Sequence, residues 1–429
     1  MLLVKSFSVR KIRTAYGVSE YRLANGLRVL YRHETATPVV AVCVTFHVGS
    51  RNEARGHTGA THILEHLLFK DSVHFNRAND NAITDYLEWF GATLNATTWS
   101  DRTNYFELLP RERLPEALRL EADRMRGSLF SDADLATEMT VVRNEYERSR
   151  NNPFELLDEA VMATAFTTHP YRIPTIGLKK DIEGSTAKKL REFYDAFYWP
   201  NNATLTVIGD VPWSVVRKFI LAYFAPIPHS PHKIPSMNIR EPIQTASRTC
   251  SLKKPLGISL ASLAYKIPEG THADYPALLL LGMVLAGGFS SRLQRVLVDT
   301  GLAAGLSVNA FALHDPGVLS FMVHVAEGVK PQTVLTVMHK ELARFIKEGC
   351  TGRELAHAKE RIFSYLAAGR DGVLNEARTL SEAIAAGDWT IEYSLESMLR
   401  RVGVAEVSRV AKKYLRKSHE TSGTLRSTT

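Results

Sequence analysis

The stretch Thr61-His62-Ile63-Leu64-Glu65-His66-Leu67-Leu68-Phe69 decides how the rest of the chain is interpreted. If this apolar run is helical, His62 and His66 are four residues apart and project from one face, close enough to bind a single metal ion. Glu65 lies beside them but points elsewhere, which suits a carboxylate that acts on a water molecule rather than on the metal. The order H-x-x-E-H is the inverse of the commoner H-E-x-x-H zinc-binding signature.

A structural role in the core is the alternative interpretation, because a histidine on an apolar helix is usually a satisfied core residue. Two histidines and a glutamate inside an apolar core would need partners or lose their charge. A metal ion supplies such a partner. The pattern therefore favours a metal site over a purely structural helix.

Composition describes an ordinary folded chain with more than one domain. Its 429 residues are too many for one ordinary core, and 45% hydrophobic with 23% charged residues is typical of globular proteins. No apolar run approaches the 18 or so residues of a membrane span. The net charge of +8 is spread along the sequence without a basic stripe that carries aromatics. We therefore expect neither a membrane span nor nucleic-acid binding.

The cysteines and the N-terminus bear on the compartment. Three widely separated cysteines without a C-x-x-C pair indicate buried thiols in a reducing environment, and they are Cys43, Cys250 and Cys350. No apolar signal-peptide core is visible at the N-terminus. Four basic residues precede the first acidic one, as in an organelle transit peptide, but a basic first strand over residues 4–12 is the favoured interpretation. We expect a cytoplasmic protein, with the mitochondrial matrix or the periplasm as alternatives.

The segments before the histidine run predict strands. Residues 21–23 and 27–31 flank Asn25-Gly26, which is the strongest short signal for a β-hairpin. Residues 39–46 form a strongly apolar run that predicts a buried strand. A glycine-containing loop then leads into the histidine run.

Three blocks of sequence carry a resemblance to a known family. They are Asn25-Gly26-Leu27-Arg28-Val29, Val48-Gly49-Ser50-Arg51-Asn52-Glu53, and the run from Thr58 to Lys70 that contains the two histidines. In residues, order and spacing these blocks resemble the opening of the pitrilysin, insulinase and mitochondrial processing peptidase family. That family consists of zinc metallopeptidases, so the resemblance implies one Zn²⁺ per chain and a peptide substrate.

The resemblance also implies the remaining metal ligand. Residues 135–150 predict an amphipathic helix that holds Glu138 and Glu145, seven residues apart and so on one face. By composition alone both would be solvated surface acids, but two histidines leave a zinc site in need of a third protein ligand. In the family this ligand is a glutamate at the distance of Glu145 from His66, with a second glutamate in the place of Glu138. We therefore expect Glu145 to bind the metal and Glu138 to orient a ligand.

Residues 91–98 and 102–106 predict two strands joined by a polar turn, which by itself is an ordinary hairpin. In the family this stretch is an edge strand of the active site. An exposed edge can bind an extended peptide as an added strand. The resemblance therefore implies a substrate-binding role for Asn95 and Ala96.

Four prolines within residues 225–235 mark a linker, because neither a helix nor a central strand tolerates them. The strand and two helices expected over residues 106–150 recur over 321–370, at an offset of about 215 to 220 residues. We expect an α+β protein of two homologous domains, each a mostly antiparallel sheet packed with helices. The expected bounds are 17–225 for the zinc-binding domain, 226–240 for the linker and 241–429 for a second domain that holds no zinc.

The second half departs from the family at one signature position and in its last residues. Gly287-Gly288-Phe289-Ser290-Ser291-Arg292-Leu293, followed by Gly301-Leu302-Ala303, matches the second-domain signature. In the family the arginine and a tyrosine of Gly-Leu-Ala-Tyr reach the substrate near the zinc. Arg292 is present, but Ala304 replaces the tyrosine, so that contact is absent, is made by another group, or comes from another chain. Residues 420–429 are also unusually polar where a last apolar strand is expected.

The resemblance implies a zinc endopeptidase that acts on unfolded peptides or flexible segments. His62, His66 and Glu145 would hold Zn²⁺, with Glu65 as the proton-transferring base. Family enzymes enclose their substrate in a chamber of four such domains, so we expect a homodimer or a heterodimer with a related subunit. A non-proteolytic structural or peptide-binding subunit of a larger complex is the alternative.

Overall fold

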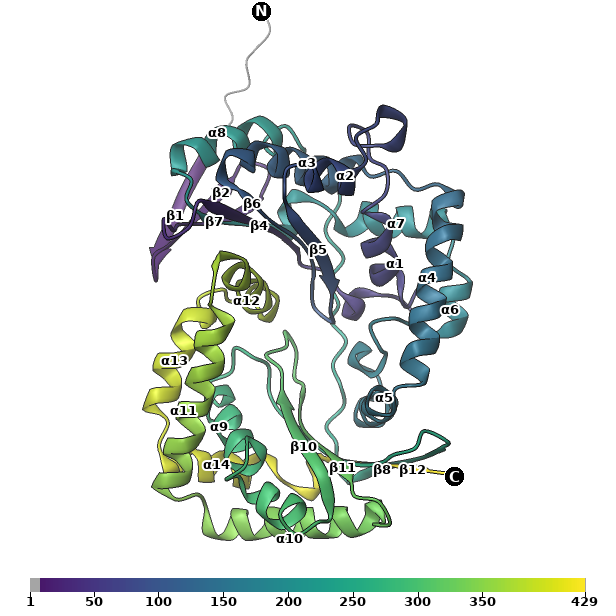
Figure 1. Cartoon of the computed structure of the whole chain (residues 1–429), viewed down its shortest axis with the longest axis vertical. Coiled ribbons are helices and arrows are strands. Elements are labelled where there is room, and N and C mark those ends of the chain that lie inside the picture. The colour runs from purple at the N-terminus through teal and green to yellow at the C-terminus, as the bar shows by residue number, and fades with distance from the viewer. Residues whose placement is uncertain (1–7, 429) are drawn as a thin grey trace, which may run out of the picture. The chain divides into compact units, whose positions relative to one another are not determined.

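The computed structural model describes residues 8–428, which form two compact units. Within these residues, the first unit combines 8–143, 175–238 and 369–390, and the second combines 144–174, 239–368 and 391–428. Each unit thus contains segments from both halves of the chain (Figure 1). Over residues 8–428, no helix is long and apolar enough to cross a lipid bilayer.

The first unit is built on a seven-stranded mixed sheet in the order β1-β2-β3-β7-β4-β6-β5, counted over the described residues. All neighbouring strands are antiparallel except β3 and β7. Its strands are β1 (Val9–Ala15), β2 (Val18–Leu23), β3 (Arg28–His33), β4 (Val39–Phe46), β5 (Thr93–Thr98), β6 (Thr103–Pro110) and β7 (Ala203–Gly209). Its helices are α1 (Ala60–Leu67), α2 (Ile83–Glu88), α3 (Leu114–Gly127), α6 (Lys179–Glu183), α7 (Ala187–Phe197), α8 (Trp213–Tyr223) and α12 (Val373–Ala386), and α4 (Asp132–Arg150) begins in this unit.

The second unit is built on a five-stranded mixed sheet in the order β10-β11-β9-β12-β8, again counted over the described residues. Only β12 and β8 are parallel in it. Its strands are β8 (Arg248–Lys254), β9 (Ser259–Lys266), β10 (Ala303–Ala310), β11 (Val318–Val325) and β12 (Glu420–Ser427). Its helices are α5 (Pro153–Ala165), α9 (Tyr275–Ala286), α10 (Pro331–Glu348), α11 (Gly352–Gly369), α13 (Ile391–Arg401) and α14 (Val404–Tyr414).

The internal repeat predicted from the sequence is visible in the two sheets. The order β3-β7-β4-β6-β5 in the first corresponds strand by strand to β8-β12-β9-β11-β10 in the second, and the parallel pair lies at the same place in both. Helix α9 takes the place of α1 in the second repeat. It is a buried apolar helix that contains neither His nor Glu. The α+β class with two homologous domains is therefore confirmed.

The two repeats exchange one helix. Helix α5 comes from the first half of the chain but packs on β8, β9 and β12 of the second sheet. Its counterpart α12 comes from the second half and packs on β4, β6 and β7 of the first sheet. Ser381 of α12 accepts hydrogen bonds from Thr45 Oγ1 at 3.1 Å and Asn104 Nδ2 at 2.9 Å. The first sheet is therefore covered in part by residues that lie beyond position 370.

Alternation of side chains along β9 explains how the second sheet is covered on both faces. Ala261 and Leu263 belong to the large apolar core that α9, α10 and α14 share with the sheet. Leu260 and Ala264 point to the opposite face, where they pack with Leu157 and other residues of α5. Each face of the sheet thus buries its own apolar cluster.

The C-terminal segment forms a strand despite its polarity. β12 lies between β9 and β8, and its buried Glu420 accepts a hydrogen bond from Tyr265 Oη at 2.8 Å. A Cβ atom at Gly423 would lie 2.4 Å from Cγ2 of Val161, so only glycine allows α5 to pack this closely. Glu420 is therefore accommodated by a specific partner rather than by exposure.

Several local predictions can be compared with these elements. The hairpin around Asn25-Gly26 is confirmed as antiparallel β2 and β3. The strand predicted over residues 4–12 is observed as β1 from Val9, while residues 1–7 lie outside the described residues. The prolines of the predicted linker lie in residues 224–247, which form neither helix nor strand. The expected linear bounds of the two homologous halves stay a prediction, because the compact units interleave the chain.

Candidate metal centre

Helix α1 carries the two histidines on the face opposite its apolar contacts. Ile63, Leu64 and Leu67 are fully buried, whereas His62 and His66 are half-buried. The helix begins after Gly59, whose φ of +88° favours glycine. A Cβ at Gly59 would also lie 2.5 Å from the carbonyl oxygen of Ile176, so the preceding backbone is held tightly.

A buried carboxylate holds the N-terminal end of α1. The two oxygens of Glu53 accept hydrogen bonds from the backbone N–H groups of Gly59 and Thr61, each at 2.8 Å. Burial raises the pKa of Glu53 to about 7, although the two backbone donors favour the ionised form. Glu53 therefore satisfies two of the N–H groups that a helix start leaves unpaired.

A buried arginine holds the other end of α1. Nε of Arg124, on α3, donates to the carbonyl oxygen of Leu68 at 3.1 Å. The same guanidinium pairs with Glu121 and with Glu107, and all three side chains are almost completely buried. The two ends of the histidine helix are thus fixed by charged groups from outside it.

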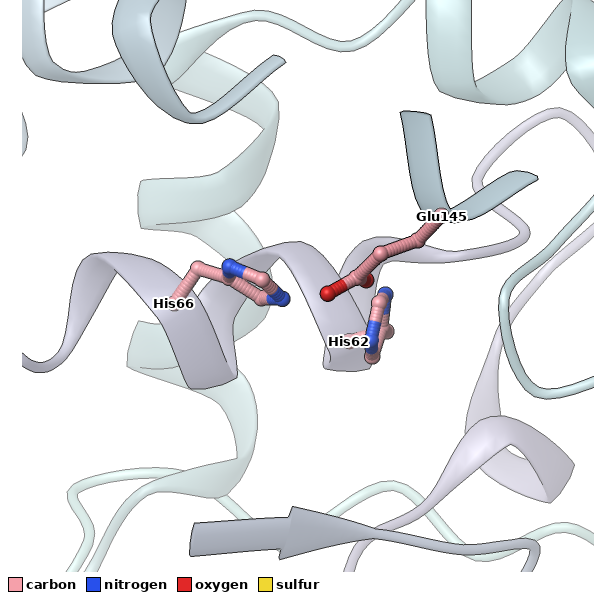
Figure 2. Close-up of side chains that lie close together, drawn as sticks. All are labelled: His62, His66 and Glu145. Carbon is pink, nitrogen blue, oxygen red and sulfur yellow. The ribbon is translucent and has the colours of Figure 1, made fainter. Parts of the chain in front are cut away.

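Three side chains converge where the sequence predicted a metal site. His62 and His66 on α1 and Glu145 on α4 each offer one ligand atom, and these atoms lie within 4.8 Å of one another. Figure 2 shows the carboxylate of Glu145 directed toward the two imidazole rings. The division between the units falls within α4, after Arg143, so Glu145 is placed by the same continuous helix that carries Glu138.

The donor set fits zinc. Two imidazole nitrogens and one carboxylate oxygen are a ligand set that Zn²⁺ accepts, and it leaves one position of a tetrahedron open. Burial, with a contribution from the charge on His66, lowers the pKa of His62 to about 4. His62 is therefore neutral at pH 7, as a metal ligand must be.

Glu138 contacts His66 of the histidine helix and Lys70, which follows that helix. Its Oε2 lies 3.0 Å from Nδ1 of His66, and its Oε1 lies 2.6 Å from Nζ of Lys70. A proton on Nδ1 of His66 donated to this carboxylate leaves Nε2 with a free lone pair. The orienting role expected for Glu138 is compatible with this contact.

Glu65 lies on α1 between the two histidines and is half-buried. Its charge interacts electrostatically with two buried tyrosines. Burial raises the pKa of Tyr105 and of Tyr198 above the usual range, and the carboxylate of Glu65 raises both further. The predicted base therefore interacts electrostatically with two buried phenol groups.

The predicted peptide-binding residues lie on an edge strand. β5 is the last strand of the first sheet and contacts α1. The side chain of Asn95 is exposed and that of Ala96 is buried. The backbone N–H of Ala96 donates to Oδ1 of Asn95 at 2.8 Å, so a side chain covers this donor.

Arg292 lies in the second unit and is 7% exposed. Its Nε and one terminal nitrogen donate to the two oxygens of Glu354 at 2.8 and 3.0 Å, and that nitrogen also donates to the carbonyl of Gly349 at 2.7 Å. Ala304 is exposed and sits at a bulge of the edge strand β10. A role of Arg292 toward a substrate stays a prediction.

Glu53, Lys70 and Arg124 were not singled out from the sequence. A signal existed for Arg124, because Glu121 and Arg124 fall on the apolar face of α3 beside Leu118 and Met125. Charged residues on a buried face need ion-pair or hydrogen-bond partners. Lys70 could have been noticed as the residue four positions after His66.

Family models match most of the chain. The model described as Insulinase (Peptidase family M16) matches residues 28–179, and the model described as Peptidase M16 inactive domain matches residues 185–362. The first match contains all three predicted ligands, and the second contains Arg292. The two matches follow one another in the order of the two sequence repeats.

Individual relatives of known sequence are also zinc proteases by name. The chain is 33% identical over 332 residues to the zinc protease PqqE of Helicobacter pylori, which covers 76% of this chain and 73% of that protein. It is 25% identical over 350 residues to the uncharacterized zinc protease YmxG of Bacillus subtilis, with 80% of this chain and 82% of that protein covered.

Solved structures share the fold. A protease from Helicobacter pylori superposes with a TM-score of 0.90 at 27% identity over 98% of this chain and 100% of that one. The periplasmic protease PqqL of Escherichia coli gives a TM-score of 0.79 at 18% identity, with 97% of this chain matched to 48% of PqqL. The fold, the matched family models and the relationship to PqqE show that the chain belongs to the insulinase family of peptidases, M16.

Proposed function

We propose that this chain is a zinc-dependent endopeptidase that hydrolyses unfolded peptides or flexible polypeptide segments. The observation that carries the proposal is the convergence of His62, His66 and Glu145 within 4.8 Å, with Glu65 on the same helix as the histidines. The names of the related zinc proteases support it.

Each residue has a distinct task in the proposed mechanism. His62, His66 and Glu145 would hold one Zn²⁺, which when bound supplies a Lewis acid that polarises the scissile carbonyl and acidifies water. Glu65 takes a proton from the attacking water at its carboxylate and returns it to the leaving amine nitrogen. Glu138 keeps the proton of His66 at Nδ1, so that Nε2 faces the metal position.

The edge strand β5 is the proposed binding site for the substrate backbone. A peptide that adds beside β5 would pair with its outward N–H and C=O groups next to α1. The N–H of Ala96 would exchange its bond to Asn95 for one to the peptide. Such pairing makes few demands on side chains, which fits a broad range of unfolded substrates.

We further propose that two chains together form the closed chamber, as a homodimer or with a related subunit. This chain matches about half of PqqL at the level of the fold, which supports a complete enzyme of twice this size. A non-proteolytic or peptide-binding subunit is the second candidate. The alanine at position 304 favours it, because the family tyrosine is missing from this chain.

Cleavage of a random peptide pool, analysed by mass spectrometry with and without a chelator, tests the activity. We expect metal-dependent cleavage by the wild type, loss of cleavage with retained zinc in Glu65→Gln, and loss of zinc in Glu145→Gln. Glu147→Gln is the matched control, because it makes the same change two residues further along α4. Full activity of Glu65→Gln, or a pure protein that binds no zinc, would refute the proposal and favour the second candidate.

A further inference from the structure

The second unit contains a large groove that the proposed mechanism does not use. It has a volume of about 960 Å³ and lies between the end of α9, the loop that follows it, and α11. All of its lining residues belong to the second unit. The groove is therefore a feature of the second unit alone.

Three arginines and a histidine line this groove, namely Arg295, Arg353, Arg361 and His357. The arginines are exposed, and within residues 8–428 none of the three makes an ion pair with a carboxylate. Two glutamates also line the groove, but Glu354 is already paired with Arg292. An excess of positive charge therefore remains on the groove.

The aromatic residues in the groove are unusually exposed. Phe289 is 87% and Tyr365 is 58% exposed. Arg361 donates to the hydroxyl of Tyr365 at 3.1 Å and lies close to Gly288, where a Cβ would be 2.7 Å from the guanidinium. The φ of +133° at Gly288 also favours glycine, so the loop is shaped to admit this arginine.

Two more features indicate that a ligand belongs here. Ser291 lines the groove and is 6% exposed, yet its hydroxyl has no hydrogen-bond partner within the described residues. A smaller apolar pocket of about 220 Å³ shares Met283 and Tyr365 with the groove and is otherwise lined mainly by aliphatic residues. A buried hydroxyl group normally has a hydrogen-bond partner, so a ligand could supply the one that Ser291 lacks. An apolar pocket beside guanidinium groups suits a ligand that carries both an apolar group and an anionic group.

We propose that this groove binds an acidic peptide segment that carries a bulky apolar side chain. Carboxylates of the segment pair with Arg295, Arg353 and Arg361, since guanidinium groups bind carboxylates in a bidentate way. The apolar side chain enters the smaller pocket beside Tyr365. A peptide fits better than a nucleic acid, because the smaller pocket is lined mainly by aliphatic residues and suits an apolar side chain rather than a sugar or a phosphate.

This inference rests on the proposed function in one respect, namely that the occupant is a peptide substrate. The groove would then select peptides by an acidic stretch, while β5 binds their backbone without regard to sequence. Binding measured without zinc separates the two proposals, because it requires no cleavage.

The test is fluorescence anisotropy of the full chain, with a chelator present, against labelled short peptides of Glu, Ser and one Phe. The variant replaces Arg295, Arg353 and Arg361 with Gln, and we expect binding to weaken about tenfold or more. The control replaces Arg10, Lys11 and Arg22 with Gln, which changes the net charge equally on β1 and β2, and we expect it to bind as the wild type does. Added salt should weaken wild-type binding.

Several outcomes would overturn the proposal. Wild-type affinity in the groove variant, an equal loss in the control, or tighter binding of a Lys-containing peptide would each refute it. A single-stranded oligonucleotide that binds more tightly than the acidic peptide would assign the groove to a different ligand. If sedimentation showed that the groove variant alone converts a dimer to a monomer, the groove would be an interface between copies. Loss of peptide binding in the groove variant of a chain that cleaves nothing would uphold this inference and refute the proposed activity.

Discussion

The carboxylate of Glu138 lies between His66 of α1 and Lys70, three residues after the end of that helix, with one oxygen 3.0 Å from Nδ1 of His66 and the other 2.6 Å from Nζ of Lys70. A single carboxylate therefore links the last turn of α1 to the segment that follows it. Its effect on the imidazole can be measured separately from catalysis.

Replacing Glu138 with Gln should weaken zinc binding by about 10- to 100-fold, because the amide no longer holds the proton of His66 at Nδ1 as firmly. Competition with a coloured zinc chelator measures this affinity. Lys70→Met should have a smaller effect in the same direction, because the lysine contacts the carboxylate and not the imidazole. An affinity for zinc in Glu138→Gln that equals that of Glu147→Gln would contradict this role.

Glu53→Gln should lower stability by about 1–3 kcal/mol, because an amide can accept only one of the two backbone hydrogen bonds at the start of α1. Zinc affinity should fall as well, since His62 follows Thr61 directly. Urea unfolding and chelator competition measure the two effects. Glu112→Gln makes the same chemical change on an exposed side chain and should alter neither, and an equal effect of both substitutions would refute the assignment.

Arg124→Met should be among the most damaging substitutions in the first unit. It leaves Glu107 and Glu121 buried without their cation, a situation that costs about 3–5 kcal/mol and lowers the thermal midpoint by about 6–20 °C. A triple variant that also replaces both glutamates with Gln should regain part of this loss. If the triple variant melts no higher than Arg124→Met, the buried charges are not the cause.

Acid should destabilise the second unit through Glu241. Burial alone would raise the pKa of this carboxylate, but hydrogen bonds from the backbone N–H groups of His169, Thr168 and Thr167 lower it to about 2. A carboxyl group whose pKa is lower in the folded state than in the unfolded state stabilises the folded protein. This stabilisation is complete at pH values above the unfolded pKa, near 4.5, and it is lost as the pH falls toward 2. Because this carboxylate is partly exposed, solvent screening reduces the effect to about 1–2 kcal/mol.

The measurement is the urea midpoint between pH 6 and pH 2.5, followed by a probe in the second unit. Glu241→Gln should lower the midpoint at pH 6 and flatten its dependence on pH below 4.5. Glu327→Gln, on an exposed side chain, serves as the control. A dependence on pH in Glu241→Gln that matches the control would show that this carboxylate is not responsible.

Much of this arrangement could be predicted because it is local. The spacing of His62, Glu65 and His66 fixes their faces as soon as the stretch is helical, and the hairpin at Asn25-Gly26 is set by two residues. Glu145 required a comparison with related sequences, because nothing in α4 itself distinguishes a ligand from a surface acid. Its position near the histidines is a property of the folded chain.

The contacts that the sequence did not reveal join residues far apart along the chain. Glu138 meets His66 across 72 positions, and Arg124 meets Leu68 across 56. The exchange of α5 and α12 was also not foreseen, because a linear repeat gives no sign that equivalent helices cover each other's sheets. Arg292 illustrates the same limit, since its pairing with Glu354 depends on tertiary packing.

The exchanged helices have a consequence for synthesis on the ribosome. Domains generally fold from the N-terminus as the chain emerges, but the first sheet here obtains α12 only after residue 386 has been made. Until then Thr45 and Asn104 lack their shared partner Ser381, and the histidine helix belongs to an unfinished unit. A ribosome stalled in the linker would therefore hold a nascent chain that has every zinc ligand but not yet a completed first unit.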